Sequence, residues 1–92
     1  MEKELSKKPG FKKLCLTLAG LKDEKKIAAL LRDVATLNEL MDMSDRITVA
    51  EMIKKEIPYR TISEKTGVST TTVTRVAHWI HHGAGGYELV LN

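Results

Sequence analysis

The spacing of residues around Gly67 constrains the fold more strongly than any other feature of this sequence. Ile62 precedes this glycine by five residues, and Val73 and Val76 follow it, three residues apart. This spacing is typical of two short helices joined by a tight turn, because glycine adopts the left-handed backbone conformation at little cost. The segment from about residue 59 to about residue 80 is therefore predicted to be a helix-turn-helix.

Three neighbours of the glycine bear on the same prediction. Ser63 is small where the two helices must approach closely, and Ser69 is a natural N-cap for the second helix. Val68 adds an apolar contact directly after the turn. Thr66 departs from the pattern, because a leucine is expected there to seal the crossing.

The second helix of this motif has a polar face opposite Val73 and Val76. The side chains on this face are Thr70, Thr71, Thr74, Arg75 and His78. Threonine can contact base edges or the thymine methyl group, and arginine can pair with guanine or with a phosphate. We therefore expect this helix to enter the major groove of double-stranded DNA, with Tyr59, Arg60 and Ser69 near the phosphates.

The rest of the chain has the composition of an all-α protein. Only 4% of the 92 residues are aromatic and no stretch has useful β-alternation, which favours helices packed through aliphatic side chains. We expect a single domain over residues 1–92 with five or six helices, starting near Phe11 after a frayed opening that ends at Pro9-Gly10. Within the helices expected at about 11–35, the apolar positions from Ile27 to Ala35 cover more than one face. A monomer this small would struggle to cover them, so these helices are expected to form a dimer.

Local signals place the boundaries of the middle helices. Thr36 and Glu39 form a predicted capping box, in which each side chain reaches the backbone of the other residue. Ser44 or Asp45 is expected to restart this helix, which should then run to Pro58. Pro58 also suits the first turn of the next helix.

Composition and charge exclude several classes of function. The formal net charge of +3 fits nucleic-acid binding, and the single cysteine, Cys15, fits a reducing compartment, so a cytoplasmic location is expected. No apolar run approaches the roughly 18 residues that a membrane span needs. No serine or cysteine has a histidine at a spacing that implies catalysis, so no enzyme activity is expected. No cofactor or metal site is expected either, because His78 and His82 lack a third ligand.

Several stretches of the sequence resemble the Trp repressor superfamily, and more closely its Trp-repressor-like YerC/YecD family. They are Thr36-Leu37-Asn38-Glu39-Leu40, Asp45-Arg46 with Val49-Ala50 and Met52, Ile62 through Arg75, and Gly86-Tyr87-Glu88. The likeness covers most of the chain from about Phe11. It implies a six-helix chain that interlocks with a second copy, the N-terminal helices of each subunit being wrapped by the other.

The same resemblance implies a possible ligand pocket. Arg46 and Arg75 fall on the two arginines that bracket tryptophan in the repressor, if the connection before Pro58 is one residue shorter here. Val76 and Trp79 stand where the repressor leaves room for the indole and offers a hydroxyl. Their bulk should clash with a second indole, so tryptophan is not expected as an effector, and the effector, if one exists, is unknown.

The sequence therefore predicts a homodimeric, sequence-specific DNA-binding regulator, most simply a repressor. Two other functions remain open at this stage. One is a small-molecule sensor that binds DNA only with its effector, and the other is a protein-interaction module whose helix-turn-helix is a relic. Salt dependence separates DNA binding from the last function, because DNA releases counterions when protein binds.

Overall fold

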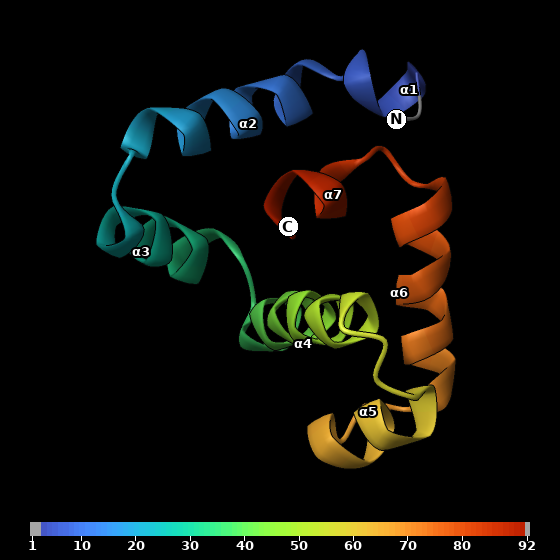
Figure 1. Cartoon of the computed structure of the whole chain (residues 1–92). Coiled ribbons are helices and arrows are strands. Elements are labelled where there is room, and N and C mark those ends of the chain that lie inside the picture. The colour runs from blue at the N-terminus through green and yellow to red at the C-terminus, as the bar shows by residue number, and fades with distance from the viewer. Residues whose placement is uncertain (1–2, 92) are drawn as a thin grey trace. The chain divides into compact units, whose positions relative to one another are not determined.

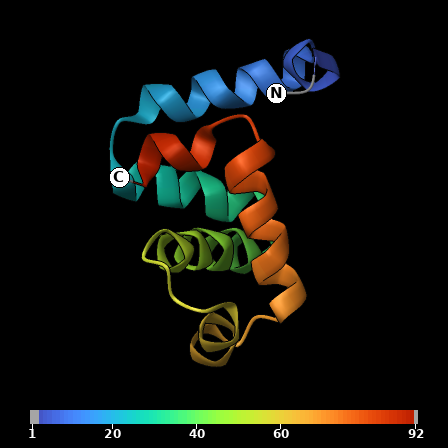
Figure 2. The ribbon, with the colours of Figure 1, turned by 45° about the vertical axis from the view of Figure 1, so that its right-hand side comes forward.

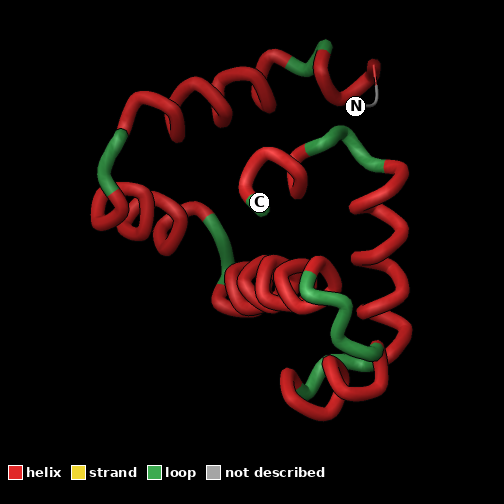
Figure 3. The backbone as a smooth tube through the Cα atoms, viewed as in Figure 1, coloured by secondary structure: helices red, strands yellow, loops and turns green. Residues whose placement is uncertain are grey.

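The computed structural model describes residues 3–91, and within them the chain is helical with connecting loops and no strands (Figure 1 and Figure 3). The helices are α1 (Lys3–Ser6), α2 (Pro9–Leu21), α3 (Glu24–Val34), α4 (Leu37–Lys54), α5 (Tyr59–Thr66), α6 (Thr70–His82) and α7 (Gly86–Val90). The all-α prediction is confirmed. The described residues form seven helices instead of the expected five or six. Two of the seven, α1 and α7, are short, with four and five residues.

Contacts between Cα atoms divide the chain into two compact units, residues 1–40 and residues 41–92. Helices α1 to α3 belong to the first unit, and α5 to α7 belong to the second. Helix α4 begins in the first unit and continues in the second. The expectation of a single domain stays a prediction.

The first helices of the N-terminal unit start at earlier residues than the sequence suggested. Helix α2 starts at Pro9, two residues before Phe11, so the Pro9-Gly10 pair forms the start of the helix and does not precede it. Proline suits the first helical position, because the N–H that it lacks would have no partner within the helix. Residues 3–6, expected to be frayed, form the short helix α1.

The helices α2 and α3 bury no side chain fully, although both carry apolar residues at helical spacing. Phe11, Leu18 and Leu21 of α2 are half-buried. In α3, Ile27 is half-buried, whereas Val34 leaves 62% of its surface exposed. Within one chain, these helices therefore lack a core of their own.

The capping box at the start of α4 is confirmed. The Thr36 N–H donates to Glu39 Oε1 at 2.8 Å, and the Glu39 N–H donates to Thr36 Oγ1 at 3.1 Å. Hydrogen bonds from the Thr36 backbone N–H and then from its hydroxyl lower the pKa of the Glu39 carboxyl below its usual value. The box satisfies N–H groups that have no partner inside a helix.

The predicted restart of this helix at Ser44 or Asp45 is wrong, because α4 is continuous from Leu37 to Lys54. Ser44 has the side chain of a capping residue, but its backbone remains helical. Its carbonyl also accepts a hydrogen bond from Thr48 Oγ1 at 3.3 Å. A polar residue inside a helix that is already capped need not interrupt it.

Helix α4 also ends before Pro58, not at it. Glu56 has a left-handed φ of 61°, its N–H donates to Ile53 O at 2.9 Å, and the Ile57 N–H donates to Met52 O at 3.1 Å. These two bonds form a Schellman motif, which closes the last turn of a helix. Pro58 is then the N-cap of α5, one residue earlier than the predicted first turn.

The C-terminal unit contains the hydrophobic core. The buried apolar side chains all come from α4, α5 and α6, and they are Val49, Ala50, Ile62, Val73, Val76, Ala77 and Ile80. Tyr87 and Leu91 pack against this cluster from α7 and from the residue that follows it. Within this unit α6 runs past α4, and α5 lies beside the N-terminal end of α6 (Figure 2). The core thus holds α6 from one side.

Among the described residues, none of the helices combines the length and the apolar character that crossing a membrane requires.

Candidate nucleic-acid interface

The turn between α5 and α6 has the geometry predicted for Gly67. Its φ is 81° and its ψ is −2°, and its N–H donates to Ser63 O at 2.9 Å. A Cβ built at this position would meet nothing within 4 Å. The requirement for glycine therefore comes from the left-handed backbone and not from crowding.

Two hydroxyl groups fix the same turn. Ser63 Oγ donates to Val68 O at 2.6 Å, and Thr66 Oγ1 donates to Ile62 O at 2.7 Å while accepting from the Val68 N–H at 3.3 Å. This explains Thr66, where a leucine was expected, because its hydroxyl satisfies backbone groups at the end of α5. A threonine in the last turn before a glycine is the signal that the sequence analysis left unused.

Ser69 caps α6 as predicted. Its Oγ accepts from the Thr72 N–H at 3.1 Å and lies 3.1 Å from the Thr72 hydroxyl, and its carbonyl accepts from the Val73 N–H at 3.1 Å. Thr72 is half-buried and takes part in this cap. Two of the three consecutive threonines, Thr70 and Thr71, therefore remain exposed.

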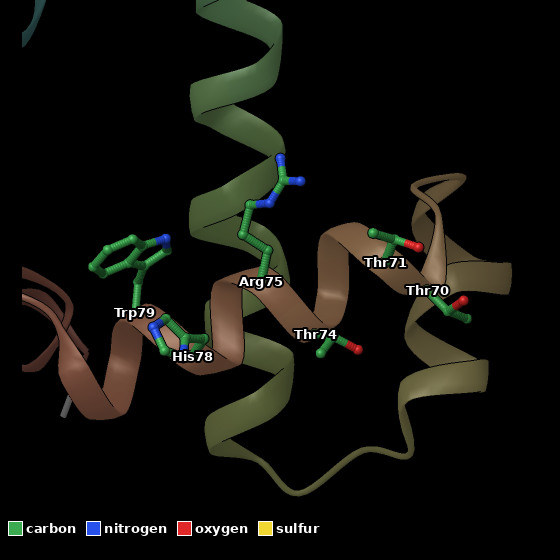
Figure 4. Close-up of a pocket in the computed structure, with 6 residues that line it drawn as sticks. All are labelled: Thr70, Thr71, Thr74, Arg75, His78 and Trp79. Atoms are coloured by element: carbon green, nitrogen blue, oxygen red, sulfur yellow. The ribbon is translucent and has the colours of Figure 1, made fainter.

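Helix α6 separates buried from exposed side chains in the way that the spacing predicted. Its inward residues are Val73, Val76, Ala77 and Ile80, and all are buried. Its outward residues form a shallow cavity of about 690 Å³, lined by Thr70, Thr71, Thr74, Arg75, His78 and Trp79 (Figure 4). Five of these six residues were predicted to contact DNA. Trp79, which leaves 50% of its surface exposed, joins them from the next turn.

The residues predicted near the phosphates flank this cavity in the sequence but do not line it. Tyr59 and Arg60 are exposed at the start of α5, and Ser69 is exposed at the N-cap of α6. Arg60 Nε lies 3.9 Å from Glu64 Oε1, and the two side chains are 91% and 71% exposed. Such an exposed pair contributes little to stability, so Arg60 can exchange this partner for another anion.

A second cavity brings together all four residues of the predicted ligand pocket. Arg46, Arg75, Val76 and Trp79 line it with two residues that the sequence analysis did not include, and its volume is about 380 Å³. Those two residues are Thr72 and Tyr87. Tyr87 reaches this wall from α7, a packing relationship that local spacing along the chain does not reveal. Two guanidinium groups beside aromatic rings can accommodate an anion with a flat apolar part.

Trp79 also borders a third cavity, of about 600 Å³, which is mainly apolar. Its other walls come from α4, from α7 and from the loop before α7: Met43, Arg46, Ile47, Gly83, Ala84, Gly86, Tyr87 and Val90. Trp79 thus lines all three of these cavities. Across residues 3–91, no three His, Cys, Asp or Glu side chains lie close enough together to hold a metal ion.

Comparisons with known proteins agree with this geometry. A family model described as Trp repressor protein matches residues 10–92. The chain is 32% identical over 76 residues to YerC, an uncharacterized protein of Bacillus subtilis (strain 168), covering 83% of this chain and 73% of that protein.

Two crystal structures are also similar in fold and sequence. A TrpR like protein from Eubacterium eligens ATCC 27750 superposes with a TM-score of 0.86 at 36% identity, covering 91% of this chain and 87% of that one. A proposed Trp repressor from Staphylococcus aureus superposes with a TM-score of 0.88 at 29% identity, covering 98% of this chain and 90% of that one.

Proposed function

The chain belongs to the Trp repressor protein family, and we propose that it is a sequence-specific DNA-binding transcriptional regulator that acts as a homodimer. The observation that carries this proposal is the outward face of α6. Thr70, Thr71, Thr74, Arg75 and His78 are exposed on this face, while the opposite side of the helix is buried in the core.

A helix held in this way can present its side chains to DNA without reorganising. Its backbone is fixed at the N-terminus by Ser69 and along its length by Val73, Val76 and Ile80. A protruding helix with short polar side chains fits the major groove, which is wide enough to admit an α-helix. The exposed hydroxyls and the Arg75 guanidinium then supply donors and acceptors for base edges.

The dimer is proposed because the N-terminal helices are poorly buried within one chain. Neither α2 nor α3 buries a side chain, and Leu14, Leu16 and Val34 are among their exposed apolar residues. A second copy would cover this surface and place two recognition helices on one duplex. In a two-fold dimer these helices enter successive major grooves about 34 Å apart, so the target should be near-palindromic.

The first experiment selects binding sites from a random duplex pool and then measures affinity for the selected duplex in a series of salt concentrations. We expect affinity to fall steeply with salt, because bound cations are released from the phosphates. Binding to a protein partner with no salt-dependent binding to any duplex would instead support the protein-interaction function. Light scattering measures whether the protein is a dimer.

Two arginine variants then separate base contacts from phosphate contacts. Arg75→Ala should lower affinity for the selected site by about 1–3 kcal/mol and relax the sequence preference, if Arg75 contacts a base. Arg60→Ala is the matched control, since a phosphate contact weakens all sequences alike and reduces the salt slope by about one. Unchanged affinity of the Arg75 variant would remove this residue from the set of base contacts.

A second function, binding of DNA only with a small-molecule effector, is favoured by the cavity between Arg46 and Arg75. The two guanidinium groups select an anionic ligand. L-tryptophan itself is not expected, because Trp79 and Val76 already occupy walls of this cavity. Calorimetric titration with L-tryptophan should show no saturable binding, and a micromolar dissociation constant would contradict that expectation.

A further inference from the structure

The C-terminal unit, which contains the helix-turn-helix, has a low formal charge for a protein proposed to bind a polyanion. Residues 41–92 contain six Lys and Arg side chains and six Asp and Glu side chains, so their formal charge is zero without histidine. The formal charge of +3 therefore lies in residues 1–40. Helix α6 has one permanently charged side chain, Arg75, but three histidines. Phosphate contacts dominate the affinity of most DNA-binding proteins, so these histidines are the available source of additional charge.

The three histidines gather in the last two turns of α6. The ring centroids of His78 and His82 are 4.9 Å apart, and those of His81 and His82 are 6.5 Å apart. All three side chains are exposed, and His78 lines the outward cavity with Thr74 and Arg75. The cluster therefore extends the proposed DNA-binding face toward the C-terminal end of the helix.

Within residues 3–91, the carboxylates that form ion pairs on the helices around α6 do so with Lys54 or Arg60 and not with these histidines. On α7, Glu88 is held by Lys54 of α4, with both carboxylate oxygens 3.0 Å from Nζ. On α5, Glu64 lies near Arg60. The remaining ionisable side chains of α4, α5 and α7 are Glu39, Asp42, Asp45, Arg46, Glu51, Tyr59, Lys65 and Tyr87. Arg75 is the one permanently charged residue that lines the same cavity as His78.

We propose that His78, His81 and His82 form a proton-dependent phosphate-binding site, so that the protein binds DNA more tightly as the pH falls from about 8 to about 6. This inference rests on the proposed DNA binding. A neutral imidazole donates one hydrogen bond, whereas a protonated one donates two and carries a positive charge.

A phosphate next to the cluster supplies a negative charge, which favours the protonated form of an imidazole. DNA therefore binds the protonated form more tightly than the neutral form, and binding takes up protons. The added affinity is complete when the histidines are protonated in the free protein. It is lost as the pH rises and the histidines of the complex release their protons.

The experiment measures affinity for the selected duplex at pH 6, 7 and 8 and at constant ionic strength. We expect affinity to rise about tenfold per pH unit for each proton taken up, with one to three protons in total. Calorimetry in buffers of different ionisation enthalpy counts these protons directly. The triple variant His78→Gln, His81→Gln and His82→Gln should retain its fold, because all three side chains are exposed, and should lose most of the pH dependence.

Lys65→Gln is the matched control. It removes a permanent charge from the same motif, so it should change affinity equally at every pH. Salt-dependent binding with the same affinity at pH 6 and pH 8 would overturn this inference and leave the proposed function intact, as would a triple variant with an unchanged pH slope. Absence of salt-dependent binding to any duplex at either pH would overturn both.

Discussion

Helices α2 and α3 bury none of their side chains completely, whereas α4, α5 and α6 together bury seven. Both regions have apolar residues at helical spacing, so the difference does not lie in the sequence pattern. It lies in the partners within the chain. Helices α5 and α6 meet across a turn of three residues and share Ile62 and Val73 in one core, whereas α2 and α3 have few contacts of this kind. A helical apolar stripe thus predicts a buried face but not which chain supplies the cover.

The largest effect is expected from a substitution in the hydrophobic core of the C-terminal unit. Ile62 has no exposed surface, and we expect Ile62→Ala to lower the free energy of unfolding by about 2–5 kcal/mol, because it leaves a cavity. Urea denaturation followed by circular dichroism measures this loss. Val34→Ala, at a site that is 62% exposed in one chain, is the control. At protein concentrations low enough to dissociate the proposed dimer, it should change the free energy of unfolding by at most about 0.5 kcal/mol. Equal losses in the two variants would contradict the contrast between the regions.

The second prediction concerns the uncovered side of α2. Leu14 leaves 41% of its surface exposed, and Leu14→Asp should weaken self-association at least about tenfold, or about 1.4 kcal/mol, because a charge would be placed in the proposed interface. Light scattering over a range of protein concentrations measures the change. Ala19→Asp introduces the same charge at an exposed position on the other side of the helix and should leave the association constant nearly unchanged. If both variants remain dimeric, α2 does not form the interface.

Two glycine-to-alanine variants, one in each region, are expected to change the stability of the protein in opposite directions. Gly67→Ala should destabilise the protein by about 1–2 kcal/mol, because alanine is strained in the left-handed backbone of this turn. Gly20→Ala lies in α2 with nothing within 4 Å of the added Cβ, and it should stabilise the protein by about 0.5–1 kcal/mol. Thermal unfolding measures both values. Effects of the same sign would show that backbone conformation does not decide them.

The smallest expected effect is a change in titration at the start of α4. The Thr36 N–H and hydroxyl lower the pKa of Glu39, so this carboxylate stabilises the helix start above its ordinary pKa. That contribution is lost as the pH falls through the lowered value. Thr36→Ala, which removes the hydroxyl, should shift the pKa of Glu39 upward, as measured by NMR titration of its carboxyl carbon. Thr17→Ala removes a hydroxyl elsewhere and should leave the Glu39 titration as it is.

Rules that act over a few residues predicted much of the fold and of the candidate interface. Gly67 and Ser69 mark a turn and a cap through their own backbone chemistry, and the spacing of Val73 and Val76 then fixes which face of α6 is outward. The end of α4 could not be found in this way. Pro58 marks the stop only approximately, because the helix already ends at Lys54 and the left-handed residue that follows, Glu56, is not a glycine.

The cavity between the arginines shows a second limit. Arg46, Arg75 and Tyr87 come from three different helices, and helix periodicity does not indicate that they line one wall. The two arginines were expected there only because of a family resemblance. Tyr87 was missed, since the packing of α7 depends on tertiary contacts with the core.

The position of Trp79 has a practical consequence for all of these measurements. It is the single tryptophan of the chain, and it borders the outward cavity of α6 as well as two further cavities. The ultraviolet emission of the unlabelled protein therefore comes mainly from one indole at the junction of these surfaces. A duplex, a small anion or a second subunit that reached any of them would alter the wavelength or the intensity of the same signal, so the molecule contains its own optical probe.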